Sequence, residues 1–148
     1  MDLKESIEIR KPPEEIFAFL AHHPNHKLIV KQNVSCEQVT PGPMGVGTRV
    51  KNVANLIGSF GRIEEFFEVT EFDPPRVLAK ASREGSSFET TDRFELRPTE
   101  AGTRVTFVVT ASAVSLGKRL VVALMKPLVK GSMTDTLASL KAVVEAQR

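Results

Sequence analysis

The sequence predicts an α+β fold in which a curved antiparallel sheet wraps around one long C-terminal helix. Strand-like segments separated by turns fill the middle of the 148-residue chain, and helical patterns lie near its two ends. The clearest turn is Asp73-Pro74-Pro75. Proline has no amide hydrogen to give to a sheet, and it disfavours helical geometry in the residue before it. We therefore expect this turn to join two paired strands.

The expected elements follow from alternation and turn residues. The first strand covers residues 6–10, where Ile7 and Ile9 alternate with Glu8. Short helices follow it, opened by Pro12-Pro13-Glu14-Glu15, because proline is tolerated in a first turn and acidic residues suit the positive end of the helix dipole. Six more strands, seven in all, are expected at residues 33–40, 48–56, 62–72, 77–83, 87–97 and 103–113.

From Gly117 the pattern is helical to the end of the chain. Pro127 and Gly131 predict a bend in the middle. On either side of it the apolar residues form two stripes, Leu120, Leu124 and Leu128, then Met133, Leu137, Leu140 and Val144. A long helix need not fill the space above a strongly curved sheet. We expect a cavity between the two, whose lining sets the function.

Composition limits the function classes. Hydrophobic residues make up 41% and charged residues 26% of the chain, which is typical of one globular domain covering residues 1–148. A net charge of +2 without a dense basic run argues against nucleic acid. Cys36 is the single cysteine, so no intramolecular disulfide forms. No apolar run has the length of a signal peptide or membrane span, and we expect a cytoplasmic protein, monomeric or homodimeric.

Several segments resemble the START-like (SRPBCC, helix-grip) superfamily, and within it the polyketide cyclase/dehydrase group. They are Pro12 to Phe17, Gly42 to Arg49, Glu68 to Arg76, Gly102 to Val105, and Leu137 to Lys141 in the closing helix. The resemblance implies one strand, two helices, six strands and a final helix around a cavity for a lipid, a polyketide or an aromatic-like molecule. Some members are cyclases or dehydrases, and others only bind ligands. The resemblance implies no cofactor.

Asp92 is the polar residue most suited to such a cavity. In the sixth strand it shares a face with Thr90, Phe94 and Leu96 by period two. A buried acid has a raised pKa and either transfers a proton or holds a ligand hydroxyl. The plainer interpretation is that Asp92 pairs with a basic neighbour. We favour a role of Asp92 in lining the cavity over a role in catalysis. If the protein is a cyclase or dehydratase, Asp92 is the one catalytic candidate. Whether the protein is an enzyme stays open.

Other positions are predicted to bind the ligand by the same face argument. Glu65 and Phe67 share a face of the fourth strand, where a bulge is expected to shift the register before Phe72. The full predicted set is Asn52, Glu65, Phe67, Thr90, Asp92, Phe94, Phe107, Val109, Leu124 and Leu128. Ordinary core packing is at least as good an explanation for each position taken singly.

Two further features have alternative interpretations. His22, His23 and His26 are suited to a metal or to general base catalysis, but we favour exposed residues at a helix end and predict no metal site. The segment 118–130 combines basic and apolar residues, as helices that contact anionic lipid do. We favour a core-packed helix with solvated lysines over this membrane contact. A membrane- or protein-associated accessory factor is therefore the third functional alternative, after ligand binding and cyclase or dehydratase activity.

Overall fold

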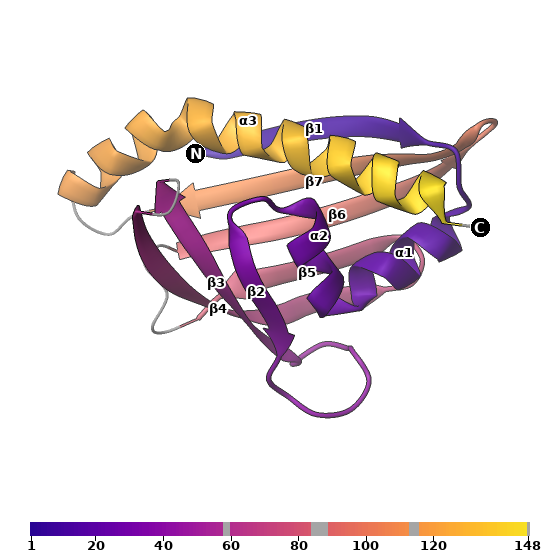
Figure 1. Ribbon diagram of the computed structural model, residues 1–148, viewed down its shortest axis with the longest axis horizontal. Coiled ribbons are helices and arrows are strands. Elements are labelled where there is room, and N and C mark those ends of the chain that lie inside the picture. Colours follow the sequence, from indigo (N-terminus) through magenta and orange to yellow (C-terminus); the bar gives the residue numbers. More distant parts are fainter. Residues whose placement is uncertain (58–59, 84–88, 113–115, 148) are drawn as a thin grey trace.

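The computed structural model describes residues 1–57, 60–83, 89–112 and 116–147. The sequence also predicts turns at residues 58–61 and at Gly85-Ser86; residues 58–59 and both Gly85 and Ser86 lie outside these ranges. The elements, drawn in Figure 1, are β1 (Asp2–Ile9), α1 (Pro13–Ala21), the 3-10 helix η1 (His23–Asn25), α2 (His26–Ile29), β2 (Asn33–Gln38), β3 (Arg49–Ile57), β4 (Phe60–Asp73), β5 (Val77–Ser82), β6 (Glu89–Thr99), β7 (Gly102–Ser112) and α3 (Leu116–Ala146).

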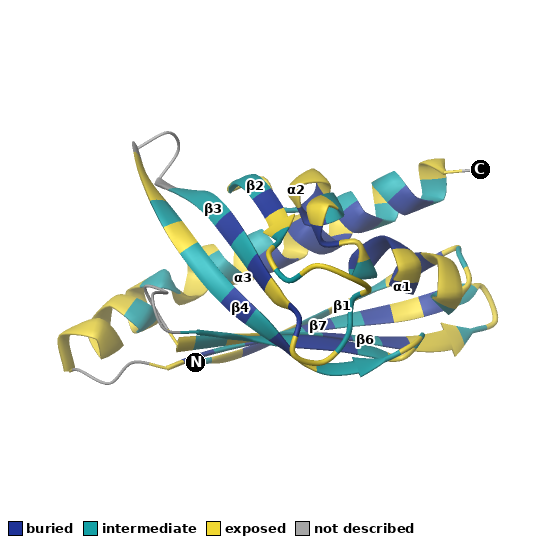
Figure 2. Cartoon of the chain, turned by 90° about the horizontal axis from the view of Figure 1, so that it is seen from below, coloured by how far each residue is buried: buried dark blue, intermediate teal, exposed yellow. Residues whose placement is uncertain are grey.

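Within the described residues, the strands form one seven-stranded antiparallel sheet in the order β1-β7-β6-β5-β4-β3-β2. Figure 2 shows β2, β3 and β4 rising at an angle to the plane of β1, β6 and β7, with the helices on one side of the sheet. The predicted architecture is confirmed. The first strand begins at Asp2 rather than residue 6, because its charged start also pairs with β7, from Asp2 opposite Thr110 to Ile9 opposite Thr103.

The core lies between the concave face of this sheet and the helices. Its fully buried side chains come from every layer, including Ile9 of β1, Leu20 of α1, Val105 of β7 and Leu140 of α3. At the start of β7 the backbone lies very close to the backbone at the end of β1. At Gly102, whose φ is +152°, an added Cβ would lie 2.2 Å from the carbonyl oxygen of Ile9. Only glycine fits this position without displacement.

A bulge in β4 changes which residues face inward. The pairing with β5 shifts between Val69 and Glu71, as expected from the sequence. Phe67 and Val69 are buried before the shift, and beyond it Phe72 turns inward and packs edge-on against Phe17 of α1. The extra residue moves the apolar side chains to the same face on both sides of the bulge.

Helix α3 is one continuous, gently bent helix that passes through Pro127 (Figure 1). Its C-terminal stripe is buried as predicted, with Met133, Leu137, Leu140 and Val144 at most 2% exposed. The expectation that the other stripe also faces the sheet is wrong, since Leu120, Leu124 and Leu128 are exposed. The inward face continues instead through Val129, Met125 and Val122, at steps of three and four residues. The three leucines fall on a different side of the helix.

Candidate functional site

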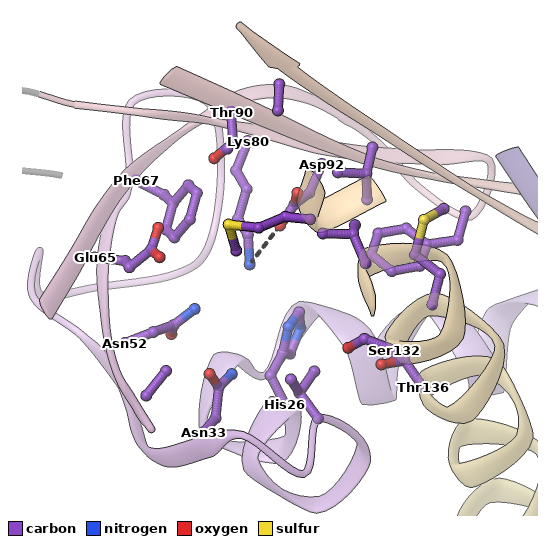
Figure 3. Close-up of a pocket in the computed structure, with 18 of the residues that line it drawn as sticks. His26, Asn33, Asn52, Glu65, Phe67, Lys80, Thr90, Asp92, Ser132 and Thr136 are labelled. Carbon is purple, nitrogen blue, oxygen red and sulfur yellow. Dashed lines mark ion pairs between the residues drawn. The ribbon is translucent and has the colours of Figure 1, made fainter. Parts of the chain in front are cut away.

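A cavity of about 250 Å³ lies between α3 and the concave face of the sheet. Its walls are mostly apolar and include the stacked rings of Phe94 and Phe107, whose centroids are 4.3 Å apart. Figure 3 shows the polar side chains that point into it from several elements, His26, Asn33, Asn52, Glu65, Lys80, Thr90, Asp92, Ser132 and Thr136. An apolar cavity with a few convergent polar groups is the usual form of a small-molecule site.

All predicted site residues on the strands line this cavity. They are Asn52, Glu65, Phe67, Thr90, Asp92, Phe94, Phe107 and Val109. The two predicted positions on α3 do not, because Leu124 is 69% exposed and Leu128 is 71% exposed. Val122, Met125 and Val129 line the cavity from that part of the helix.

Lys80 and Asp92 form an ion pair on the sheet wall of the cavity. They lie directly opposite each other on β5 and β6, and the Lys80 Nζ is 3.7 Å from the Asp92 Oδ2. The side chains keep only 11% and 22% of their surface exposed. The Lys80 ammonium also lies 4.9 Å from the centre of the Phe67 ring, close enough for a cation–π contact. Asp92 thus lines the cavity and also pairs with a basic residue, so both interpretations drawn from the sequence apply to it.

Glu65 brings a second acid to the same cavity, from β4. Burial raises the pKa of the Asp92 carboxyl, and the charge of Lys80 partly opposes this. Burial also raises the pKa of Glu65, the negative charge of Asp92 raises it further, and Lys80 again acts in the opposite direction. One lysine between two acids of raised pKa is an arrangement that holds a polar ligand group or transfers a proton.

His23 and His26 are buried, so the expectation that they are exposed is wrong for these two, whereas His22 is exposed as expected. The η1 turn carries them inward beneath β3. The Nε2 of His23 donates to the Oδ1 of Asn52 at 2.7 Å, and the Nε2 of His26 donates to the carbonyl oxygen of Leu20 at 2.8 Å. Burial and the charge of Lys80 lower the pKa of His23 to about 3. The same causes lower the pKa of His26, so both rings are neutral.

The hydrogen bond from His23 fixes the orientation of the Asn52 amide. Because its oxygen accepts from the histidine, its nitrogen is left to donate toward the cavity, as Figure 3 shows. Asn52 lies directly opposite Glu65 in the β3–β4 pairing, so a donor and an acid stand side by side on that wall. Among the described residues, no three His, Cys, Asp or Glu side chains gather closely enough to hold a metal ion.

No helix in the described ranges has both the length and the apolar character needed to span a bilayer. Among known families, the model of polyketide cyclase/dehydrase and lipid transport proteins matches residues 1–145. No curated protein matches the chain.

Solved structures resemble the whole chain. TTHA0849 from Thermus thermophilus is 23% identical with a TM-score of 0.82, over 99% of this chain and 98% of its own. The Zhui aromatase/cyclase from a Streptomyces species is 13% identical with a TM-score of 0.77, over 98% and 93% of the two chains. The di-domain aromatase/cyclase BexL of the BE-7585A biosynthetic pathway is 20% identical with a TM-score of 0.75, over 98% of this chain and 46% of its own. At these identities the likeness establishes the fold.

Proposed function

Because the chain belongs to the polyketide cyclase/dehydrase and lipid transport family, we propose that it binds one small, mostly apolar molecule in the cavity beneath α3. The observation that carries this proposal is the uneven distribution of polar groups around the cavity. Phe94, Phe107 and Val109 of β6 and β7 give an apolar wall, whereas Lys80 and Asp92 pair across β5 and β6. A ligand with an apolar body and one oxygen-bearing end matches both parts.

The size of the cavity narrows the ligand class. A cavity of about 150 Å³ lined by apolar side chains holds one benzene molecule, and this cavity measures about 250 Å³. This suits a molecule of one or two rings better than a long-chain lipid. A phenol or ketone oxygen reaches two donors, the ammonium of Lys80 and the amide nitrogen of Asn52, and a hydroxyl also finds the acceptor oxygens of Asp92 and Glu65. The proposed substrate class is therefore a hydroxylated or keto aromatic compound.

Binding of β-naphthol tests the proposal directly. The chain has no Trp and no Tyr, so the fluorescence anisotropy of the ligand is measured with little protein background. We expect β-naphthol to bind about tenfold more tightly than naphthalene, because one buried hydrogen bond to a charged group contributes about 1.5 kcal/mol. Asn52→Leu should reduce this preference. Val46→Ser, a change at a 70% exposed side chain, is the control. Absence of binding by both compounds, together with no small molecule released from the purified protein in native mass spectrometry, would refute the proposal.

A cyclase or dehydratase is the second candidate, favoured by the two acids that share the cavity with Lys80. In the dehydration of a β-hydroxy ketone, one carboxylate takes the α-proton while the Lys80 ammonium holds the carbonyl oxygen. The other acid, whose raised pKa favours the protonated form, gives its proton to the leaving hydroxyl. Water and a conjugated enone are the products.

The aldol adduct of benzaldehyde and acetone is a suitable probe for this reaction, because its product benzylideneacetone absorbs in the near ultraviolet. A rate above buffer that falls at least about a hundredfold in Asp92→Asn supports catalysis. Binding of β-naphthol without any turnover of the adduct would favour a ligand-binding role alone.

A further inference from the structure

The N-terminal half of α3 carries a row of large apolar side chains on its outer surface. Leu116, Leu120, Leu124 and Leu128 follow one another at intervals of four residues, and they are 82%, 63%, 69% and 71% exposed. We call these four the outer leucine row. Side chains four apart in a helix lie on neighbouring turns of the same side, so the row is a continuous surface.

The outer leucine row lies on the side of α3 that faces away from the cavity. Val122, Met125 and Val129 of the same turns point inward and line the cavity. A helix on the surface of a soluble protein normally exposes charged or polar residues on its outer side. Here both sides are apolar. Contiguous exposed apolar surface of this kind usually marks a place where a protein meets another molecule or a membrane.

The charges of this segment indicate which partner the row meets. Residues 116–130 contain four basic residues, Lys118, Arg119, Lys126 and Lys130, and no acidic residue. At 100° per residue, Arg119, Lys126 and Lys130 fall within one narrow side of the helix, along the edge of the row. Leucines bordered by lysine and arginine are the pattern of helices that lie in the interface of an anionic bilayer.

We propose that the outer leucine row docks the protein on an anionic lipid surface, with the leucines among the acyl chains and the basic edge at the headgroups. A second copy of the chain is a poorer partner. A twofold contact places the same patch of each copy against the other, which would bring two sets of basic residues together without an acidic residue from this segment. An anionic bilayer instead offers opposite charge to the basic edge as a whole, including Lys130, which also lies 3.9 Å from Glu5 of β1.

Docking in this way also places the ligand cavity at the membrane. Figure 1 shows the first turns of α3 reaching past the end of the sheet, and the whole N-terminal half of the helix lying clear of α1 and α2. Since the same turns roof the cavity through Val122, Met125 and Val129, an apolar ligand would pass between bilayer and cavity with little exposure to water. This consequence rests on the proposed binding function, whereas the docking itself does not.

Vesicle co-sedimentation tests the docking. The probes are vesicles of phosphatidylcholine alone and of phosphatidylcholine mixed with phosphatidylglycerol. We expect binding to the mixed vesicles only, and about tenfold or greater weakening in the double variant L120S/L124S, because two leucines leave the acyl region. Lys126→Gln should weaken binding about fivefold, and high salt should weaken it further. The matched control is V39S/V46S, which changes two apolar side chains that are 55% and 70% exposed elsewhere on the surface.

The outcomes separate docking from folding and from ligand binding. Melting temperature and β-naphthol binding in L120S/L124S should match those of the original chain, because neither leucine packs in the core. No binding to mixed vesicles, or equal binding by L120S/L124S, overturns the proposal. Equal binding to phosphatidylcholine alone overturns the role of the basic edge. A concentration-dependent dimer that L120S/L124S abolishes, without vesicle binding, shows that a second copy covers the row and also overturns the proposal.

Discussion

Replacing His23 with Gln should make the protein more resistant to acid. The His23 side chain is 2% exposed, and burial is the main reason that its pKa falls from 6.5 to about 3. It stays neutral in the folded protein, while the unfolded chain binds an extra proton as pH falls below 6.5. Proton uptake by the unfolded state then lowers the free energy of unfolding progressively, from pH 6.5 down to about pH 3.

The magnitude follows from the size of the shift. Each pH unit in this window changes the free energy of unfolding by about 1.4 kcal/mol for one such group. Between neutral pH and about pH 4.5, His23 therefore removes about 3 kcal/mol of stability, or roughly 6–12 °C of melting temperature for a chain of this size. Gln at this position keeps an amide donor for Asn52 and has no titrating group.

The assay is urea unfolding of both proteins, followed by circular dichroism at neutral pH and at about pH 4.5. Between neutral pH and about pH 4.5, the free energy of unfolding of the variant should fall by about 3 kcal/mol less than that of the original chain. Titrating groups that both proteins share cancel in this comparison. His22→Gln, a change at the neighbouring exposed histidine, is the control and should retain the acid sensitivity of the original chain. Equal losses in the His23 variant and the original chain, within about 0.5 kcal/mol, would refute the argument from burial.

Three further predictions concern stability and are checked by the same unfolding measurement. Leu140→Ala should cost about 2–5 kcal/mol because this side chain is 0% exposed, whereas Leu124→Ala on the same helix should change stability by less than about 0.5 kcal/mol. Gly102→Ala should cost about 2 kcal/mol or more, since the added Cβ would meet a backbone oxygen of β1 at 2.2 Å; no loss would mean that β7 shifts easily. Asp92→Leu alone should cost about 3 kcal/mol by leaving Lys80 without its partner, but Asp92→Leu with Lys80→Met should restore or exceed the original stability.

The fold could be predicted because its signals are local. The double proline after Asp73 ends β4, and alternation along β6 and β7 identifies the buried face without knowledge of the partners. The same alternation placed Asp92 and Phe107 on the cavity wall. Period two is a property of every strand, so strand positions that line the cavity follow from the sequence once the concave face is known.

Lys80 was missed because its role depends on the pairing between strands. The sequence shows a lysine among the apolar residues of β5, but its partner is known only when the β5–β6 register is fixed and Asp92 lies opposite. The buried histidines were missed for a similar reason. The direction taken by the chain after α1 decides whether His23 points to solvent or to Asn52. That direction is set by the contact of η1 with β2 and by the hydrogen bond from His23 to Asn52 of β3.

The error in α3 has a different physical origin. Periodicity shows that a helix has apolar stripes, but a helix with two such stripes does not reveal which one faces the sheet. Burial of Met133 and Leu140 sets the rotation of the helix, and counting back in steps of three and four then selects Val129 and Met125 rather than Leu128. A continuous inward face from Val144 back to Val122 was present in the sequence and would have identified these residues.

The unequal anchoring of α3 gives its two halves different local stabilities. Met133, Leu137, Leu140 and Val144 hold the last turns in the core, and the first turns keep only half-buried contacts. Pro127, near the boundary, lacks the amide hydrogen that would tie one turn to the turn before it. We therefore expect the N-terminal half of the helix to open locally at a lower free energy than global unfolding, while the C-terminal half stays packed in the core. If the cavity binds a small molecule as proposed, this local opening would let the molecule enter and leave without unfolding of the domain.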